Sequence, residues 1–169
     1  MDSSNEHDFD FLIGHWQVLH RRLRQRLAGS DEWETFDGSS TLQTVLGGQG
    51  NIDDNWLNLP SGPYRAASLR AFDPATRRWA IWWLDGRHPH ALDAPMIGGF
   101  EAGVGRFYAD DTFNGRPIRV RFLWTDTLTP SPHWEQAFSA DAGTTWEVNW
   151  EMRFVRFVRI DAPNLPSAG

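Results

Sequence analysis

The chain has 169 residues, a formal net charge of -6 and no cysteine. This length suits one domain with a sizeable core, the negative charge disfavours a nucleic-acid partner, and the missing cysteine excludes disulfides and thiolate metal ligands. We predict a single domain over residues 1–169, with its barrel core at about 14–160, no apolar segment that spans or anchors to a membrane, and a cytoplasmic location.

The first predicted element is a single helical turn at residues 8–13, where four large apolar side chains precede Gly14. A turn of this kind plugs the end of a barrel. A strand then begins at Trp16, and its last part is rich in arginine between His20 and Arg26. The arginine stems are expected to cover an edge or a neighbouring strand, with their charged heads in solvent.

Further strands are predicted from two-residue alternation and from the turns that separate the alternating runs. They cover about 33–45, 51–59, 64–72, 78–85, 97–113 with a glycine interruption before 106, the run after Asn114-Gly115, 133–140, and 141–160. Asn114-Gly115 is the strongest hairpin signal. The last strand alternates most clearly, with Trp146, Trp150 and Phe154 on one face.

Short turns between many strands, with no helix long enough for a parallel crossover, predict an all-β antiparallel up-and-down barrel of about ten strands. A β-sandwich is the alternative, since turn spacing alone does not distinguish the two folds. A barrel of about ten strands is wide enough to hold a ligand-sized cavity. The ten tryptophans and eleven phenylalanines fill a core or line this cavity.

The loop at residues 86–99 contains two prolines and several glycines between firm strands, and we expect it to gate one barrel mouth. His88 and His90 are weak metal candidates, with Asp85 or Asp93 as a third ligand. The intervening proline and the lack of a fixed third ligand favour a plain exposed loop. We therefore predict no bound metal.

Candidate polar residues inside the barrel follow from the phase of their aromatic neighbours. His20 is in phase with Trp16, Asp54 with Trp56, and Arg70 with Tyr64. His20 or Asp54 is a candidate general acid or base, whereas Asp54 and Arg70 form either a buried ion pair or a site for an anionic ligand head. The predicted ligand-binding set is Trp16, His20, Asp54, Trp56, Tyr64, Arg70, Trp83, Tyr108, Trp124, Phe138 and Trp150.

The opening Phe9-Asp10-Phe11-Leu12-Ile13-Gly14-His15-Trp16 resembles the short helix and Gly-X-Trp start of lipocalin-like (calycin) barrels. Residues 46–50, 72–74, 79–83, 139–146 and 150–152 look like successive blocks of a bacterial lipocalin-like family of unknown function. The resemblance implies a calycin barrel and carries over no catalytic residue. A more distant similarity is to nitrobindin-type haem barrels, whose haem is held by a histidine late in the barrel.

The last strand of this chain has no histidine, and His133 is out of phase with the inward Trp134, so we predict no haem. The leading hypothesis is a barrel that binds a small, mostly apolar molecule between aromatic walls. The alternatives are an isomerase or a hydratase/lyase that uses His20 or Asp54, and a haem protein. The oligomeric state stays open, with a homodimer among the options.

Overall fold

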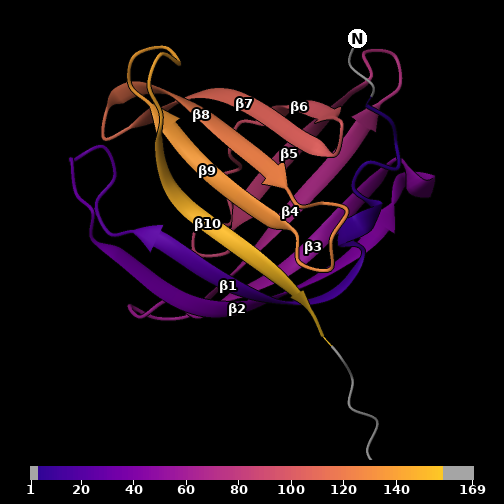
Figure 1. Ribbon diagram of the computed structural model, residues 1–169, viewed down its shortest axis with the longest axis horizontal. Helices are drawn as coiled ribbons and strands as arrows, with labels where there is room; N and C mark the ends of the chain where they lie inside the picture. The colour runs from indigo at the N-terminus through magenta and orange to yellow at the C-terminus, as the bar shows by residue number, and fades with distance from the viewer. Residues whose placement is uncertain (1–3, 158–169) are drawn as a thin grey trace, which may run out of the picture.

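A computed structural model of the chain describes residues 4–157, and these residues form a closed antiparallel β-barrel (Figure 1). The order of strands around the barrel is β1-β10-β9-β8-β7-β6-β5-β4-β3-β2, so each strand pairs with its sequence neighbours and β10 closes onto β1. The strands are β1 Gly14–Leu23, β2 Trp33–Val45, β3 Gly50–Leu57, β4 Tyr64–Asp73, β5 Arg78–Asp85, β6 Met96–Glu101, β7 Val104–Phe113, β8 Arg116–Thr125, β9 His133–Ser139 and β10 Glu147–Arg156. The prediction of an all-β up-and-down barrel is confirmed.

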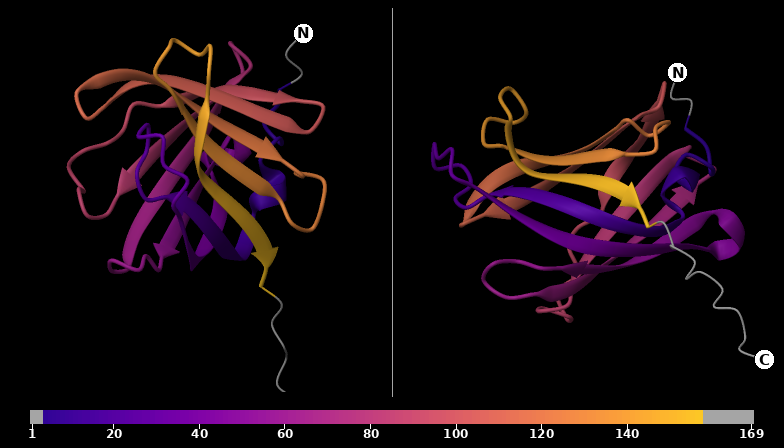
Figure 2. Two further views of the ribbon diagram at one scale, coloured as in Figure 1. Left: turned by 60° about the vertical axis from the view of Figure 1, so that its left-hand side comes forward. Right: turned by 60° about the horizontal axis from the view of Figure 1, so that its bottom comes forward.

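The described chain contains two short 3-10 turns, η1 Asp10–Leu12 and η2 Leu46–Gly48. The first of these, predicted as a plug, closes one end of the barrel (Figure 2). Phe9 is 1% exposed and lies against the rings of Trp79, Phe100, Phe107 and Trp124. Buried aromatic rings of this size dominate the energetics of a core. The plugged end is therefore a packed aromatic layer.

The polar residues at 4–8, before this plug, are also held by specific hydrogen bonds. Ser4 is fully buried and its hydroxyl donates to Asp8 at 2.6 Å. The Trp79 indole nitrogen donates to the carbonyl of Asn5 at 3.1 Å. Residues 4–8 are thus tied to the hairpin between β4 and β5.

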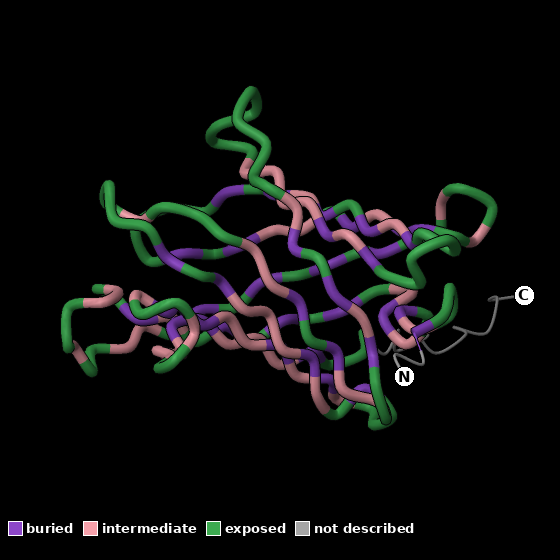
Figure 3. Tube along the Cα trace, turned by 90° about the horizontal axis from the view of Figure 1, so that it is seen from above, coloured by how far each residue is buried: buried purple, intermediate pink, exposed green. Residues whose placement is uncertain are grey.

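Buried and exposed residues alternate along most strands, as Figure 3 shows along the chain trace. In β4 the buried side chains are Tyr64, Ala66, Ser68, Arg70 and Phe72, and the residues between them are exposed or half-buried. Because successive side chains of a strand point to opposite faces, this set defines the interior of the barrel. The interior therefore includes polar residues as well as aromatic ones.

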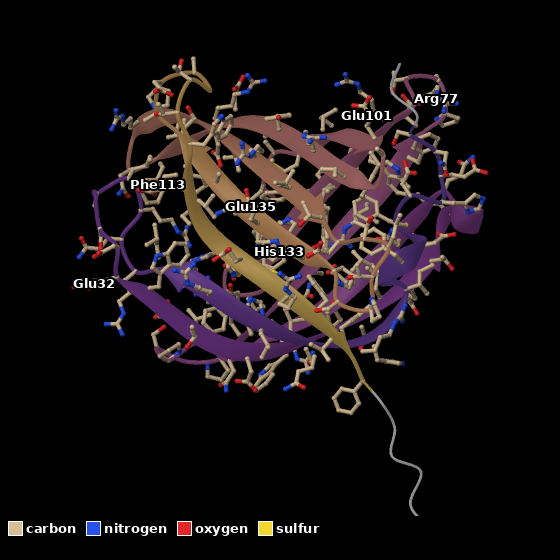
Figure 4. The ribbon with its side chains drawn as sticks, in the orientation of Figure 1. Glu32, Arg77, Glu101, Phe113, His133 and Glu135 are labelled. Atoms are coloured by element: carbon tan, nitrogen blue, oxygen red, sulfur yellow. The ribbon has the colours of Figure 1, made fainter. Side chains whose placement is uncertain are left out.

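The predicted Asn114-Gly115 hairpin is present, and both residues have positive φ, at 50° and 74°. A two-residue turn with positive φ at both positions matches the twist of paired strands, which explains the Asn-Gly sequence. The turn joins β7 to β8 at the open end of the barrel. Figure 4 shows Phe113 and Glu32 at this end, and Arg77 and Glu101 at the plugged end.

The alternation predicted for residues 141–160 holds only in part. A bulge between Val148 and Trp150 shifts the register of β10 against β9. Trp150, Met152 and Phe154 still line the interior, but Trp146 lies outside against Tyr108, with ring centroids 6.0 Å apart. Because Glu147 lies opposite Phe138, it falls on the inward face of β10. The end of this predicted strand, 158–160, lies outside the described residues.

Candidate functional site

The barrel encloses a cavity of about 320 Å³ that extends from above the plug to the open end. A volume of this order lies at the lower end of the range for small-molecule sites. The aromatic part of its wall is made by side chains from β5, β7, β8, β9 and β10. These are Trp83, Phe113, Phe122, Trp124, Trp134, Phe138, Trp150 and Phe154.

The aromatic rings are arranged edge to face around Trp150. Its ring centroid lies 5.7 Å from that of Trp134 and 6.1 Å from that of Trp83, at interplanar angles of 83° and 84°. Trp134 in turn meets Phe122 at 4.9 Å. Edge-to-face pairs are the favoured geometry for aromatic side chains. The wall is therefore rigid, apolar and polarisable.

A buried polar cluster lies on the wall formed by β3 and β4. Arg70 pairs with Asp53 at 2.8 Å, and the two side chains are 7% and 4% exposed. Arg70 also donates to the Asn51 side-chain oxygen at 3.0 Å, and Asp53 accepts hydrogen bonds from the Ser68 backbone nitrogen at 2.6 Å and from the Asn55 amide. A buried charge pair of this kind needs such partners, because desolvation of each ion costs several kcal/mol.

The partner of Arg70 is Asp53, whereas the sequence analysis named Asp54. Asp54 lies on the outer face, where it pairs with Arg65 at 3.0 Å and both side chains are about two-thirds exposed, at 67% and 66%. Trp56 follows the same outward phase and is half-buried. The expectation that Asp54 and Trp56 point inward is wrong, because the interior phase of β3 is the more polar one.

His20 does point inward, as predicted, and is 5% exposed. Its Nδ1 accepts a hydrogen bond from the Trp150 indole at 3.2 Å, and its ring stacks on Phe36 at 4.6 Å. Burial, together with the positive charge of Arg22, lowers the pKa of His20 to about 3, and Asp37 opposes the shift. The imidazole is therefore neutral at neutral pH, with its proton on Nε2.

The space beside His20 is available because residue 38 is a glycine. A Cβ built on Gly38 would lie 2.9 Å from His20 Nε2 and 2.4 Å from the Trp56 carbonyl oxygen. The Nδ1 atom of His20 is thus engaged by the Trp150 indole, and its Nε2 atom lies beside Gly38. Among residues 4–157, His20 is the only histidine that lines the cavity.

The open end carries charged residues from two sides. Arg22 of β1 and Arg26 of the following loop line the cavity on one side, and Asp85, Asp93 and Asp111 line it on the other. Arg22 pairs with Glu34 at 2.9 Å. Burial raises the pKa of Asp93, and the neighbouring carboxylates Asp111 and Asp85 raise it further. The mouth is therefore cationic on the β1 side and acidic on the β5 to β7 side.

Arg87 and Tyr64 lie between these two sides. The Arg87 guanidinium lies 3.7 Å from the centre of the Tyr64 ring and pairs with Asp85 at 2.6 Å. Burial raises the pKa of the Tyr64 hydroxyl, although the positive charges of Arg87, Arg22 and Arg26 act against this shift. Tyr64 therefore keeps its proton at neutral pH and offers a hydroxyl at the mouth.

Of the eleven residues predicted to contact a ligand, seven line the cavity: His20, Tyr64, Arg70, Trp83, Trp124, Phe138 and Trp150. Trp16 is buried in the plugged end, where its indole donates to the Leu12 carbonyl at 2.6 Å. Tyr108 belongs with Asp54 and Trp56 on the outer face, where Arg119 lies 5.0 Å from its ring. Its predicted inward orientation is wrong, because Phe107 and Ala109 occupy the inward phase of β7.

Two kinds of lining residue were not predicted from the sequence. Asp53 was missed because the apolar side chains of β3 suggested the opposite phase. Arg22 and Arg26 were interpreted as solvated arginines, although Arg22 shares the phase of His20 and this phase was the available signal. His88 and His90 are exposed, and residues 4–157 contain no group of three side chains placed to hold a metal ion.

The closed barrel with a plugging turn and an interior cavity defines a lipocalin-like (calycin-like) fold. The chain is similar in structure to the S-type phycobiliprotein lyase CPES from Guillardia theta, with a TM-score of 0.62, 10% sequence identity and coverage of 94% of each chain. No protein-family model and no curated protein matches the sequence. No helix among residues 4–157 is long and apolar enough to cross a membrane.

Proposed function

We propose that the barrel binds a small molecule with a mostly apolar, flat body in its interior cavity. The observation that carries the proposal is the cavity of about 320 Å³ bordered by the edge-to-face rings of Trp83, Trp134 and Trp150. A concave site with apolar walls and a few polar groups is the usual form of a small-molecule site. The likeness to a phycobiliprotein lyase supports the fold, and at 10% identity we do not extend the proposal to that protein's reaction.

Two N–H groups on the cavity wall also support a ligand. The Arg70 Nε and Trp124 Nε1 atoms are buried and have no hydrogen-bond acceptor among residues 4–157. A buried donor without an acceptor is costly, so such groups are usually paired with a ligand or a bound water. A ligand that carries a carbonyl or another acceptor near the plugged end would satisfy one of them.

An acid-base enzyme is not part of the proposal. Burial and the charge of Arg22 keep His20 neutral, with its Nδ1 engaged by Trp150, and Asp54 lies on the outer face, so neither candidate is placed as a general acid or base in the cavity. Haem is not part of it either, because His20 is the only histidine among residues 4–157 that lines the cavity and its Nδ1 already accepts the Trp150 indole N–H. An absorption spectrum of the purified protein tests this point, and a Soret band would contradict it.

Titration with the neutral fluorescent probe phenylnaphthylamine tests the proposal. The cavity-filling change Ala109→Phe should weaken its binding about tenfold or more, because a Phe ring occupies the volume that the probe needs. Ala80→Phe is the matched control, since Ala80 lies on β5 outside the cavity lining. Val120→Phe serves as a second blocking variant if Ala109→Phe does not fold. No binding to the parent protein, or equal binding to blocked and control variants, would contradict a cavity site.

A further inference from the structure

The cationic side of the mouth contains an arginine without a carboxylate partner. Arg26 lines the cavity and is half-buried, and its guanidinium lies 5.8 Å from the centre of the Phe138 ring. Among residues 4–157 it forms no hydrogen bond and no ion pair. The nearby carboxylates are already engaged, because Glu34 pairs with Arg22 and Glu147 accepts the Leu27 backbone N–H at 2.8 Å.

The loop that carries Arg26 is fixed in a way that holds this side chain at the cavity. Leu27 has a φ of 54° and packs against the aromatic core, while its N–H is held by Glu147. A bulky residue with positive φ is an outlier that needs support from its surroundings. The backbone at Leu27, next to Arg26, is therefore strained. It is held in place by the hydrogen bond to Glu147 and by the packing of the Leu27 side chain.

The second cation on this side of the mouth is Arg22, and its hydrogen-bonding groups are only partly satisfied. Arg22 donates to Glu34 through Nη2, but its Nε is buried and has no acceptor among the described residues. Arg22 and Arg26 are close enough to act on each other electrostatically. Burial lowers the pKa of Arg26 to about 10, and the positive charge of Arg22 contributes to the shift. Two like charges held together at a low-dielectric site favour an anion between them.

We infer that the ligand carries an anionic head group, a carboxylate or a chemically similar oxyanion, which Arg26 and Arg22 bind at the mouth while the apolar body lies among the aromatic rings. This inference rests on the proposed function and names the class of ligand. The Arg26 guanidinium is the main charged donor, the Arg22 guanidinium beside it adds a second positive charge, and the Tyr64 hydroxyl at the mouth is a neutral donor. Planar guanidinium groups match the geometry of oxyanions.

The carboxylates of the mouth do not cancel this preference. Asp85 is paired with Arg87, and Asp93 and Asp111 line the opposite rim. They repel an anion on their own side of the mouth. Together with the two arginines they orient a ligand with a single acidic group, so that its head lies toward β1.

The test compares two probes with the same apolar body. Anilinonaphthalene sulfonate carries an oxyanion and phenylnaphthylamine does not. Arg26→Gln should weaken binding of the sulfonate about tenfold or more, the size expected for losing a hydrogen bond to a charged group, and should leave phenylnaphthylamine binding within about twofold. The affinity of the sulfonate for the parent protein should also fall with added salt, and this salt dependence should shrink in Arg26→Gln.

Arg24→Gln is the matched control, because Arg24 is exposed, lies outside the cavity lining and carries the same charge two residues away. It should bind both probes like the parent protein. The melting temperature of Arg26→Gln should be unchanged or higher, since Arg26 has no ion-pair partner to lose.

The outcomes show which of the two proposals fails. If both probes bind, Ala109→Phe blocks both, and Arg26→Gln leaves the sulfonate affinity unchanged, the anion inference is overturned and the cavity function stands. Equal weakening of both probes by Arg26→Gln with a lower melting temperature would show a structural role for Arg26, and it also overturns the inference. If neither probe binds the parent protein, both proposals fail.

Discussion

The place of Asp53 inside the barrel and of Asp54 outside it follows from the pairing of β3 with β4. Asn51 lies opposite Arg70 and Asp53 lies opposite Ser68, and directly opposite residues share a face. The interior phase of β4 therefore sets that of β3. The sequence of β3 alone points the other way, because its apolar Ile52 and Trp56 lie in the outward phase. The missing information was the register, which depends on the geometry of the turn at 58–63.

The buried pair leads to a prediction on stability. Arg70→Leu leaves the Asp53 carboxylate buried without its cation, and we expect a loss of about 3–5 kcal/mol in the free energy of unfolding. Arg65→Leu removes an arginine from the exposed pair with Asp54 and should cost no more than about 1 kcal/mol. Urea denaturation of both variants measures the difference. Similar small losses in both would show that Asp53 is protonated or hydrated when Arg70 is absent.

His20 leads to a prediction on pH. Its folded pKa of about 3 lies below its unfolded value of 6.5, so between these pH values His20 is protonated in the unfolded chain and neutral in the folded protein. The contribution of His20 is therefore complete above about pH 6.5 and is lost as the pH falls toward 3, at roughly 1.4 kcal/mol per pH unit. The groups that act on the ring are Arg22, Asp37, Trp150 and Phe36.

Urea denaturation between pH 5 and pH 7 measures this slope, and His20→Gln should remove most of it. The carboxyl groups with lowered pKa, such as Asp141 at about 2, lose their contribution to stability only below about pH 5, which is outside this window. An equal slope in His20→Gln and in the parent protein would mean that another group carries the pH dependence.

Among the elements, the junction of β5 with β6 is the weakest in the barrel wall. These strands share three residue pairs, whereas all other neighbours share at least five. Beyond Ile81, the connection to the next segment is a single bridge between Leu84 and Leu92 and a hydrogen bond from Asp93 to Trp83. The loop predicted as a gate connects these two weakly paired strands.

We expect amide hydrogen exchange to be fast at residues 87–91 in the free protein and slower when phenylnaphthylamine is bound. Few buried contacts and few backbone hydrogen bonds define such a region of low local stability. Ala109→Phe is the control, because a blocked cavity should leave the exchange of the loop unchanged by the probe. Slow exchange at these residues before any probe is added would show that the loop is a fixed wall.

At the scale of the whole molecule, the strand count, the hairpin order and the plug could be predicted, because turn residues and two-residue alternation are local signals. Asn114-Gly115 and the turn at 73–77 are read from a few residues each. The site could be predicted only where a strand's phase was clear, as for His20 and Arg70. The bulge at Asn149 and the mouth formed by Arg22, Arg26 and Tyr64 depend on which strands meet, and no local pattern encodes that.

The closure of β10 onto β1 differs in kind from every other strand pairing. All other neighbours are joined by a hairpin, whereas His20 and Trp150 lie 130 positions apart in the sequence and meet only when the barrel closes. Closing so long a loop carries a large entropic cost, so a sheet built from local hairpins forms before its two edges join. During refolding, the aromatic wall should therefore stand open along this seam until the bond from Trp150 to His20 forms. A ligand present at that stage reaches its site from the side, without passing the charged mouth.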